Sequence, residues 1–94
     1  MDFDWKNTAI EEGDGLSFQA VEESFEDPFA VRLLPDSPRF EQHARFFNLG
    51  RSANGEGVFS VYRANGKQVR VLAARLFEPE ETFFYKRRMK QLLD

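Results

Sequence analysis

The chain has 94 residues, with 13 basic and 16 acidic side chains, one histidine and no cysteine. This composition predicts a single domain over residues 1–94, and it excludes disulfides, thiolate metal sites and cysteine nucleophiles. Its hydrophobic content of 41% is too high for a disordered chain. Apolar runs are only a few residues long, so we expect no membrane span, no signal peptide and a cytoplasmic location.

Charge is divided unevenly along the chain. Residues 1–44 carry 3 basic and 11 acidic side chains, whereas residues 45–94 carry 10 basic and 5 acidic ones. This division suggests that the second half faces a polyanion. An equally good interpretation is that its basic side chains decorate a sheet and a helix that the acidic half covers.

The first half predicts short elements. Polar and apolar residues alternate over residues 2–6, which indicates a strand, and residues 7–12 can form at most a helical turn or two. Ser17 is a good N-cap for a helix whose apolar face holds Phe18, Val21 and Phe25. Asp27-Pro28 should end that helix.

The second half predicts an antiparallel meander. After an apolar segment over residues 29–34, three strand candidates follow in quick succession. They are Arg45 to Ser52, Gly57 to Arg63 and Lys67 to Arg75, separated by Asn54-Gly55 and Asn65-Gly66. Asn-Gly between alternating apolar runs is the strongest short-range hairpin signal.

A C-terminal helix should begin near Pro79. Its acidic residues come first and its basic residues last, which suits the helix dipole. We expect Tyr85, Met89 and Leu92 to form its inner stripe, with Phe84 and Leu93 beside it. The predicted fold is α+β, with N-terminal helices, an antiparallel sheet of about four strands and a C-terminal helix packed on the sheet. The 14 aromatic residues also predict an exposed apolar patch on or beside the sheet.

An ordered set of motifs resembles one known family over nearly the whole chain. The motifs are Phe3-x-Trp5, Leu16-Ser17-Phe18, Phe25-x-Asp27-Pro28, Arg45 to Gly50, Val61-Tyr62, Gly66-x-x-x-Arg70, Ala74-Arg75, Glu81 and Tyr85. Together they resemble the BrnT toxins, which are similar to RelE-type ribonucleases of bacterial type II toxin–antitoxin pairs. The chain departs from the family at four places. It lacks a Lys-His before Gly13, and it has Ala44, Asn65 and Ala73 where the family usually has Glu, Arg and Ser.

The resemblance implies a function and partners. It implies a RelE-like fold and cleavage of RNA without a metal or other cofactor, which would stop translation. It also implies neutralisation by a BrnA-like ribbon-helix-helix antitoxin, through which any contact with DNA would be made. A second hypothesis keeps the protein partner and drops the cleavage, because the overall charge is acidic and the four departures remove polar groups.

Cleavage of this kind needs a base for the ribose 2′-hydroxyl, an acid for the 5′-oxygen and cations for the phosphorane charge. Arg45, Arg63, Arg70 and Arg75 are the candidate cations, because a guanidinium fork bonds two phosphate oxygens. Arg70 and Arg75 are an odd number of residues apart, so they should face opposite sides unless a bulge intervenes. Arg70 with Arg45 or Arg63 is therefore the favoured phosphate-binding group.

The acid and base candidates are Glu81 and Tyr85, one helical turn apart on the same face. Each also has a structural interpretation: Glu81 as a charge at the helix N-terminus, and Tyr85 as a core ring with its hydroxyl at the rim. His43 has an ordinary pKa near neutrality but lies in a predicted loop, where solvation is the simpler role.

Overall fold

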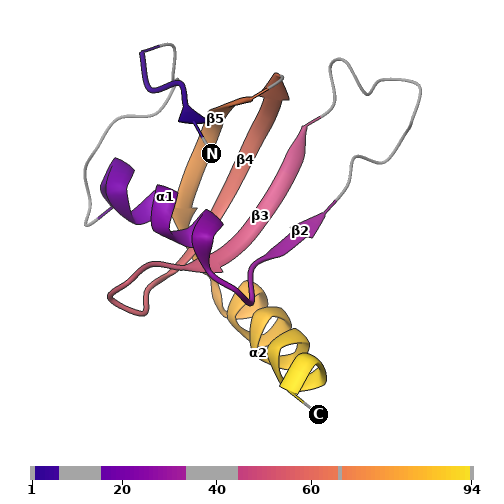
Figure 1. Ribbon diagram of the computed structural model, residues 1–94. Coiled ribbons are helices and arrows are strands. Elements are labelled where there is room, and N and C mark those ends of the chain that lie inside the picture. The colour runs from indigo at the N-terminus through magenta and orange to yellow at the C-terminus, as the bar shows by residue number, and fades with distance from the viewer. Residues whose placement is uncertain (1, 7–15, 34–44, 66, 94) are drawn as a thin grey trace.

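The computed structural model describes residues 2–6, 16–33, 45–65 and 67–93. One five-stranded sheet forms the centre of the molecule, in the order β1-β5-β4-β3-β2. Figure 1 shows α1 lying across one face of this sheet and α2 leaving from one end of it. The elements are β1 (Asp2–Phe3), α1 (Phe18–Glu26), β2 (Val31–Leu33), β3 (Phe46–Arg51), β4 (Gly57–Asn65), β5 (Gln68–Leu76) and α2 (Pro79–Leu93).

The predicted meander is confirmed. β3 pairs antiparallel with β4, from Phe46 opposite Tyr62 to Arg51 opposite Gly57, and β4 pairs antiparallel with β5. In the first turn Gly55 has φ +85°, a left-handed conformation that favours glycine. The second Asn-Gly includes Gly66, which lies outside the described residues.

Two parts of the fold prediction were wrong. The sheet has five strands rather than about four, and it is mixed, because β1 pairs parallel with β5 through Asp2 opposite Gln68 and Phe3 opposite Val69. Local alternation predicts that a strand forms but not the direction in which it adds to a sheet. α1 is the single N-terminal helix among the described residues, since the helical turn predicted over 7–12 lies outside them.

α1 begins and ends where the sequence predicted. The Ser17 side chain accepts a hydrogen bond from the Ala20 backbone amide at 3.1 Å, and Asp27 follows the last helical residue. The helix buries Val21, Ser24 and Phe25 against β3 and β4. Val21 and Phe25 form the hydrophobic core together with Val58, Tyr62, Val69 and Val71. Phe3, Trp5, Leu16, Phe46 and Ala74 are partly buried and pack against this core.

α1 and β3 approach each other unusually closely at Gly50. A Cβ atom at Gly50 would lie 1.9 Å from the Ser24 carbonyl oxygen, so only glycine fits there. The Asn48 side-chain amide donates to that same carbonyl at 3.2 Å. Backbone contact and hydrogen bond together fix the height of α1 above the sheet.

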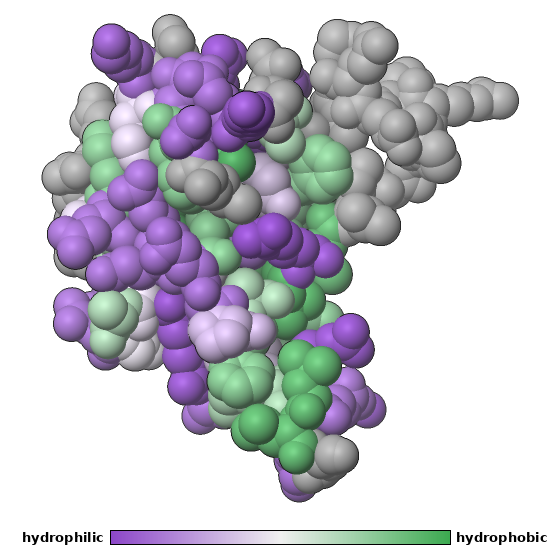
Figure 2. All heavy atoms as spheres, viewed as in Figure 1, coloured by the Kyte–Doolittle hydropathy of each residue, from purple (hydrophilic) through white to green (hydrophobic). Residues whose placement is uncertain are grey.

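The inner stripe predicted for α2 holds at Tyr85 and at the half-buried Met89 but is wrong at Leu92. Tyr85 is buried, but Leu92 and Leu93 are 58% and 67% exposed. Figure 1 shows the reason, because α2 extends past the end of the sheet and its last turns have no strand to cover. The apolar side chains that gather on this projecting segment in Figure 2 are the exposed patch expected beside the sheet. Neither of the two helices described is long and apolar enough to cross a membrane.

Candidate nucleic-acid interface

The sheet face opposite α1 brings three of the predicted arginines together. We call it the arginine face and define it by Arg63, Arg70 and Arg75 with Phe47 and Phe59. Arg63 lies opposite Arg70 in the β4–β5 ladder, and Arg75 lies opposite Phe59. Since Val58 and Tyr62 of β4 point into the core under α1, the alternate residues Phe59 and Arg63 point to the other side.

A β-bulge puts Arg70 and Arg75 on the same face. Val61 pairs with Ala73 and Tyr62 pairs with Val71, so Leu72 is an extra residue without a cross-strand partner of its own. One extra residue reverses the alternation beyond it. Arg70 and Arg75 are an odd number of residues apart and would lie on opposite faces of a regular strand. Because of the bulge, they lie on the same face. Phe59 and Arg63, the partners of Arg75 and Arg70, are four positions apart in β4, which places the two ends of the arginine face about 13 Å apart.

Aromatic rings lie next to the arginines. Phe47 and Phe59 stack across β3 and β4 with their ring centroids 5.8 Å apart and 28° between their planes. The Arg75 guanidinium carbon lies 4.6 Å from the centroid of the Phe59 ring. Both phenylalanines are only partly buried. This arrangement of a stacked pair beneath a guanidinium offers flat apolar surface and positive charge side by side.

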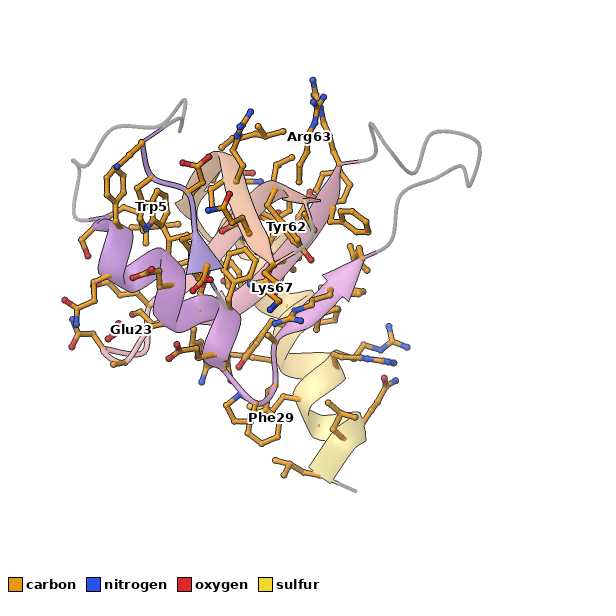
Figure 3. All side chains as sticks on the ribbon, turned by 45° about the horizontal axis from the view of Figure 1, so that its top comes forward. Trp5, Glu23, Phe29, Tyr62, Arg63 and Lys67 are labelled. Carbon is orange, nitrogen blue, oxygen red and sulfur yellow. The ribbon has the colours of Figure 1, made fainter. Side chains whose placement is uncertain are left out.

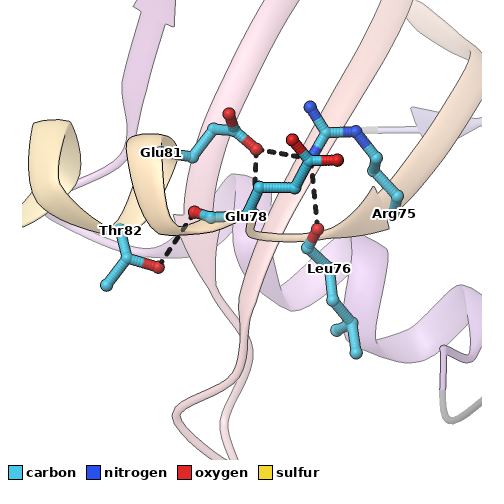
Figure 4. A network of polar contacts seen from close by, with 5 residues as sticks. All are labelled: Arg75, Leu76, Glu78, Glu81 and Thr82. Carbon is cyan, nitrogen blue, oxygen red and sulfur yellow. Dashed lines mark hydrogen bonds and ion pairs between the residues drawn. The ribbon is translucent and has the colours of Figure 1, made fainter.

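Glu81 joins the arginine face to α2 (Figure 4). Its carboxylate forms an ion pair with Arg75 and accepts the Glu78 backbone amide at 3.0 Å, while Arg75 also donates to the Leu76 carbonyl at 3.2 Å. Thr82 donates to the Glu78 carbonyl at 3.3 Å in the first turn of the helix. The hydrogen bond from Arg75 lowers the pKa of the Glu81 carboxyl, and the same bond raises the pKa of Arg75. Glu81 therefore has its predicted structural role at the helix N-terminus, and its role as acid or base stays a prediction.

The other predicted arginines differ in their surroundings. Arg70 forms an ion pair with Asp4 at 3.5 Å and leaves half of its side chain exposed. Arg63 is partly buried, and its Nε atom is one of three buried side-chain polar atoms that have no hydrogen-bond partner within the described part of the chain. Arg45 is exposed and lies one residue before Phe46, at the same end of the sheet as Arg63.

Tyr85 is held by Asp27 and Arg51 and is not one of the residues of the arginine face. It is 1% exposed, and its hydroxyl donates to the Asp27 carboxylate, which also accepts the Arg51 backbone amide at 2.7 Å. The Arg51 guanidinium carbon is 4.9 Å from the centre of the Tyr85 ring. Burial and the bond to Asp27 raise the pKa of the Tyr85 hydroxyl well above its usual value. Of its two predicted roles, this geometry suits the structural one.

Sequence reasoning missed four participants. Asp27 was interpreted only as a helix end, although its side chain also accepts the Phe29 amide at 2.9 Å and ties α1 to β3 and α2. Phe47 and Phe59 were not assigned to the site, and the signal available was that β3 and β4 carry apolar residues on both faces. Arg51 gave no signal of its own. His43 lies outside the described residues.

Among the described residues, no group of three or more His, Asp or Glu side chains is arranged to hold a metal ion. The chain matches no family model, no curated protein and no solved structure in the comparisons made.

Proposed function

We propose that the protein is the toxin of a type II toxin–antitoxin pair, a BrnT-like and RelE-like endoribonuclease that cleaves RNA without a metal and inhibits translation. The observation that carries this proposal is the β5 bulge. It turns Arg70 and Arg75 of β5 to the side that also holds Arg63 and the stacked Phe47 and Phe59. Guanidinium groups bind phosphate, and exposed rings stack with unpaired bases, so the combination suits single-stranded RNA.

The two ends of the arginine face have different roles in this proposal. Arg63 and Arg70 lie about 13 Å from Arg75 along the ladder, a distance that suits two phosphates of one RNA strand. We assign the Arg63–Arg70 pair to binding and the Arg75–Glu81 pair to the reacting phosphate. Arg45 adds charge at the Arg63 end.

The chemistry at the Arg75 end follows from the charges there. The ribose 2′-oxygen attacks the adjacent phosphorus and gives its proton to the Glu81 carboxylate, which leaves a 2′,3′-cyclic phosphate and a 5′-hydroxyl. Arg75 stabilises the negative charge of the phosphorane. The departing 5′-oxygen takes its proton from solvent, which reaches this exposed pair. When Arg75 turns to the phosphate, Glu81 loses the partner that lowers its pKa and becomes a better base.

The exposed apolar surface supports the antitoxin partner. Phe83, Phe84, Leu92 and Leu93 of α2 are between 44% and 69% exposed. Surface of this kind usually marks a protein interface. We propose a BrnA-like ribbon-helix-helix antitoxin as the partner, with DNA contacted only through it, and the cytoplasm as the location.

One observation favours the second candidate function, a catalytically impaired binding module. Arg75 is already neutralised by Glu81, and the Tyr85 hydroxyl is already bonded to Asp27. In this alternative the Arg75–Glu81 pair is only a bridge between β5 and α2. The partner interaction is then all that remains of the toxin.

Inducing the wild type, Arg70→Ala, Arg75→Ala and Lys90→Ala without an antitoxin separates the two functions. Lys90 is an exposed cation on α2 away from the arginine face and serves as the matched control. The toxin predicts growth arrest and cleaved RNA with wild type and Lys90→Ala. With purified protein and EDTA, Arg75→Ala should lower kcat by about 10²–10³-fold, whereas Arg70→Ala should mainly raise KM.

Arg70→Lys sharpens the assignment. Lysine keeps the charge but loses the bidentate fork, so KM should remain raised. Intact RNA and normal growth with folded wild-type protein would remove the nuclease and leave the binding module. Arrest that survives Arg75→Ala would remove the assigned active centre.

A further inference from the structure

A recess lies on the α1 side of the sheet, on the face opposite to the arginine face. It has a volume of about 470 Å³, and its apolar floor is made by Tyr62, Ala64 and Val69 of β4 and β5. Tyr62 is 7% exposed and Val69 is 5% exposed, so both belong to the packed core, whereas Ala64 beside them is exposed. Figure 3 shows Tyr62 and Lys67 close together at this end of the sheet. The volume falls within the range typical of small-ligand sites.

The rim of this recess is charged and mainly positive. Arg32 of β2 and Lys67 of the β4–β5 connection line it together with Asp2 of β1. The Arg32 guanidinium is positioned by a hydrogen bond to the Phe25 carbonyl at 3.0 Å. Burial raises the pKa of the Tyr62 hydroxyl, and the nearby Arg32 charge partly offsets this rise. Both side chains line the recess. Two cations and one carboxylate leave one unit of positive charge.

We infer that this recess binds one nucleotide, with the base on the Tyr62–Val69 floor and the phosphate against Lys67 and Arg32. The apolar floor suits a flat apolar ring, and the positive rim suits one negative group, so together they suit a ligand that has both. The inference rests on the proposed function when that nucleotide is part of an RNA strand. A free nucleoside monophosphate has the same chemistry and is the alternative source.

The recess lies at the same end of the β4–β5 ladder as Arg63 and Arg70, because Ala64 and Val69, which line it, form the next pair. Arg63 is two residues from the end of β4, which is roughly 7 Å of strand. Lys67 comes directly before β5 and is exposed. An RNA strand bound by Arg63 and Arg70 can therefore pass around this end of the sheet and place its next nucleotides in the recess. Asp2 lines the side of the recess nearest β1 and disfavours a second phosphate there.

The test uses binding rather than cleavage, so that it does not depend on catalysis. A labelled 2′-O-methyl oligoribonucleotide has no free 2′-hydroxyl to react, and fluorescence anisotropy gives its Kd. Lys67→Ala should weaken binding about tenfold, the loss typical of one charge-assisted contact, whereas Lys86→Ala on α2 should leave it unchanged. Uridine and adenosine monophosphate are titrated separately while the backbone amide signals are followed. We expect shifts at Tyr62, Ala64, Lys67 and Val69 that Lys67→Ala reduces.

The outcomes distinguish the two proposals. Weaker oligonucleotide binding in Lys67→Ala, with shifts in the recess, supports the site within an RNA path. Shifts with a mononucleotide but no oligonucleotide binding support a free-nucleotide site and overturn the RNA function. Oligonucleotide binding that Arg70→Ala weakens and Lys67→Ala does not, with no mononucleotide shifts, overturns the recess and leaves the proposed nuclease standing.

Discussion

The two faces of the sheet differ in what covers them. The α1 face is covered by α1, and the strand residues at its centre, such as Asn48, Val58 and Tyr62, are buried. The arginine face keeps its stacked phenylalanines partly exposed and surrounds them with guanidinium groups. Each face is expected to respond differently to the same kind of substitution, since one supplies stability and the other supplies a binding surface.

A pair of matched phenylalanine truncations should show the largest contrast. Phe25 is 3% exposed and contacts the rings of Phe3 and Tyr62, so Phe25→Ala should destabilise the fold by about 3–5 kcal/mol. Phe59→Ala removes a partly exposed ring and should cost about 1 kcal/mol. Urea unfolding of both variants measures the difference. Equal losses would mean that the arginine face is also covered, which would contradict the proposed interface.

Two glycines give the next largest contrast. Gly50→Ala pushes a methyl group into the Ser24 carbonyl and should cost roughly 3 kcal/mol, because backbone must move. Gly55→Ala meets no atom within 4 Å and carries only the strain of φ +85°, about 1 kcal/mol. Thermal or urea midpoints of the two variants should differ in that order. The reverse order would show that α1 is not held as close to β3 as described.

The Tyr85 hydroxyl separates a structural from a catalytic role. Tyr85→Phe keeps the ring and removes the bond to Asp27, so stability should fall by about 1–2 kcal/mol while RNA cleavage persists. Unfolding and cleavage are measured on the same preparation. Unchanged stability with lost cleavage would instead support Tyr85 as the acid or base of the reaction.

Replacing Glu81 should have the smallest effect on stability, and the effect should depend on pH. Its folded-state pKa is lowered below the usual 4.5, so the Arg75 pair stabilises the protein above that pH and loses this contribution as pH falls through the folded-state value. The pair is exposed, so Glu81→Gln should cost only about 0.5 kcal/mol at pH 7. The gap to wild type should close once the pH falls below the folded-state pKa, as unfolding curves over a descending pH series will show.

Glu80→Gln is the matched control for that prediction. Glu80 is exposed in the same helical turn and has no role in the Arg75 network described here. The variant should show no gap that closes with acid. A gap of the same size and pH dependence in both variants would assign the effect to helix charge rather than to the ion pair.

The local elements were predictable because their signals are local. Ser17 and Asp27-Pro28 marked both ends of α1, and Asn54-Gly55 marked the first hairpin. The β5 bulge was not predictable, because residues 71–74 are all apolar and give no alternation from which a shift could be detected. The candidate site inherits that limit. Its arginines were named from the sequence, but their shared face depends on Leu72, which has no cross-strand partner in the ladder.

Partners distant in sequence account for the remaining differences. Tyr85 meets Asp27 across 58 positions, and no spacing rule connects them. The exposed end of α2 follows from where the sheet stops, which helical periodicity cannot reveal. Both depend on how finished elements are placed against one another.

The parallel pairing of β1 with β5 also sets an order of events in folding. Asp2 pairs with Gln68, 66 residues later in the chain, so their ladder can form only after Gln68 has been synthesised. Closing so long a loop is slow compared with zipping the hairpins between β3, β4 and β5. During synthesis β1 therefore precedes the other strands of this sheet but joins the sheet last. Until it is seated, one edge of β5 offers unpaired backbone groups to any neighbouring nascent chain.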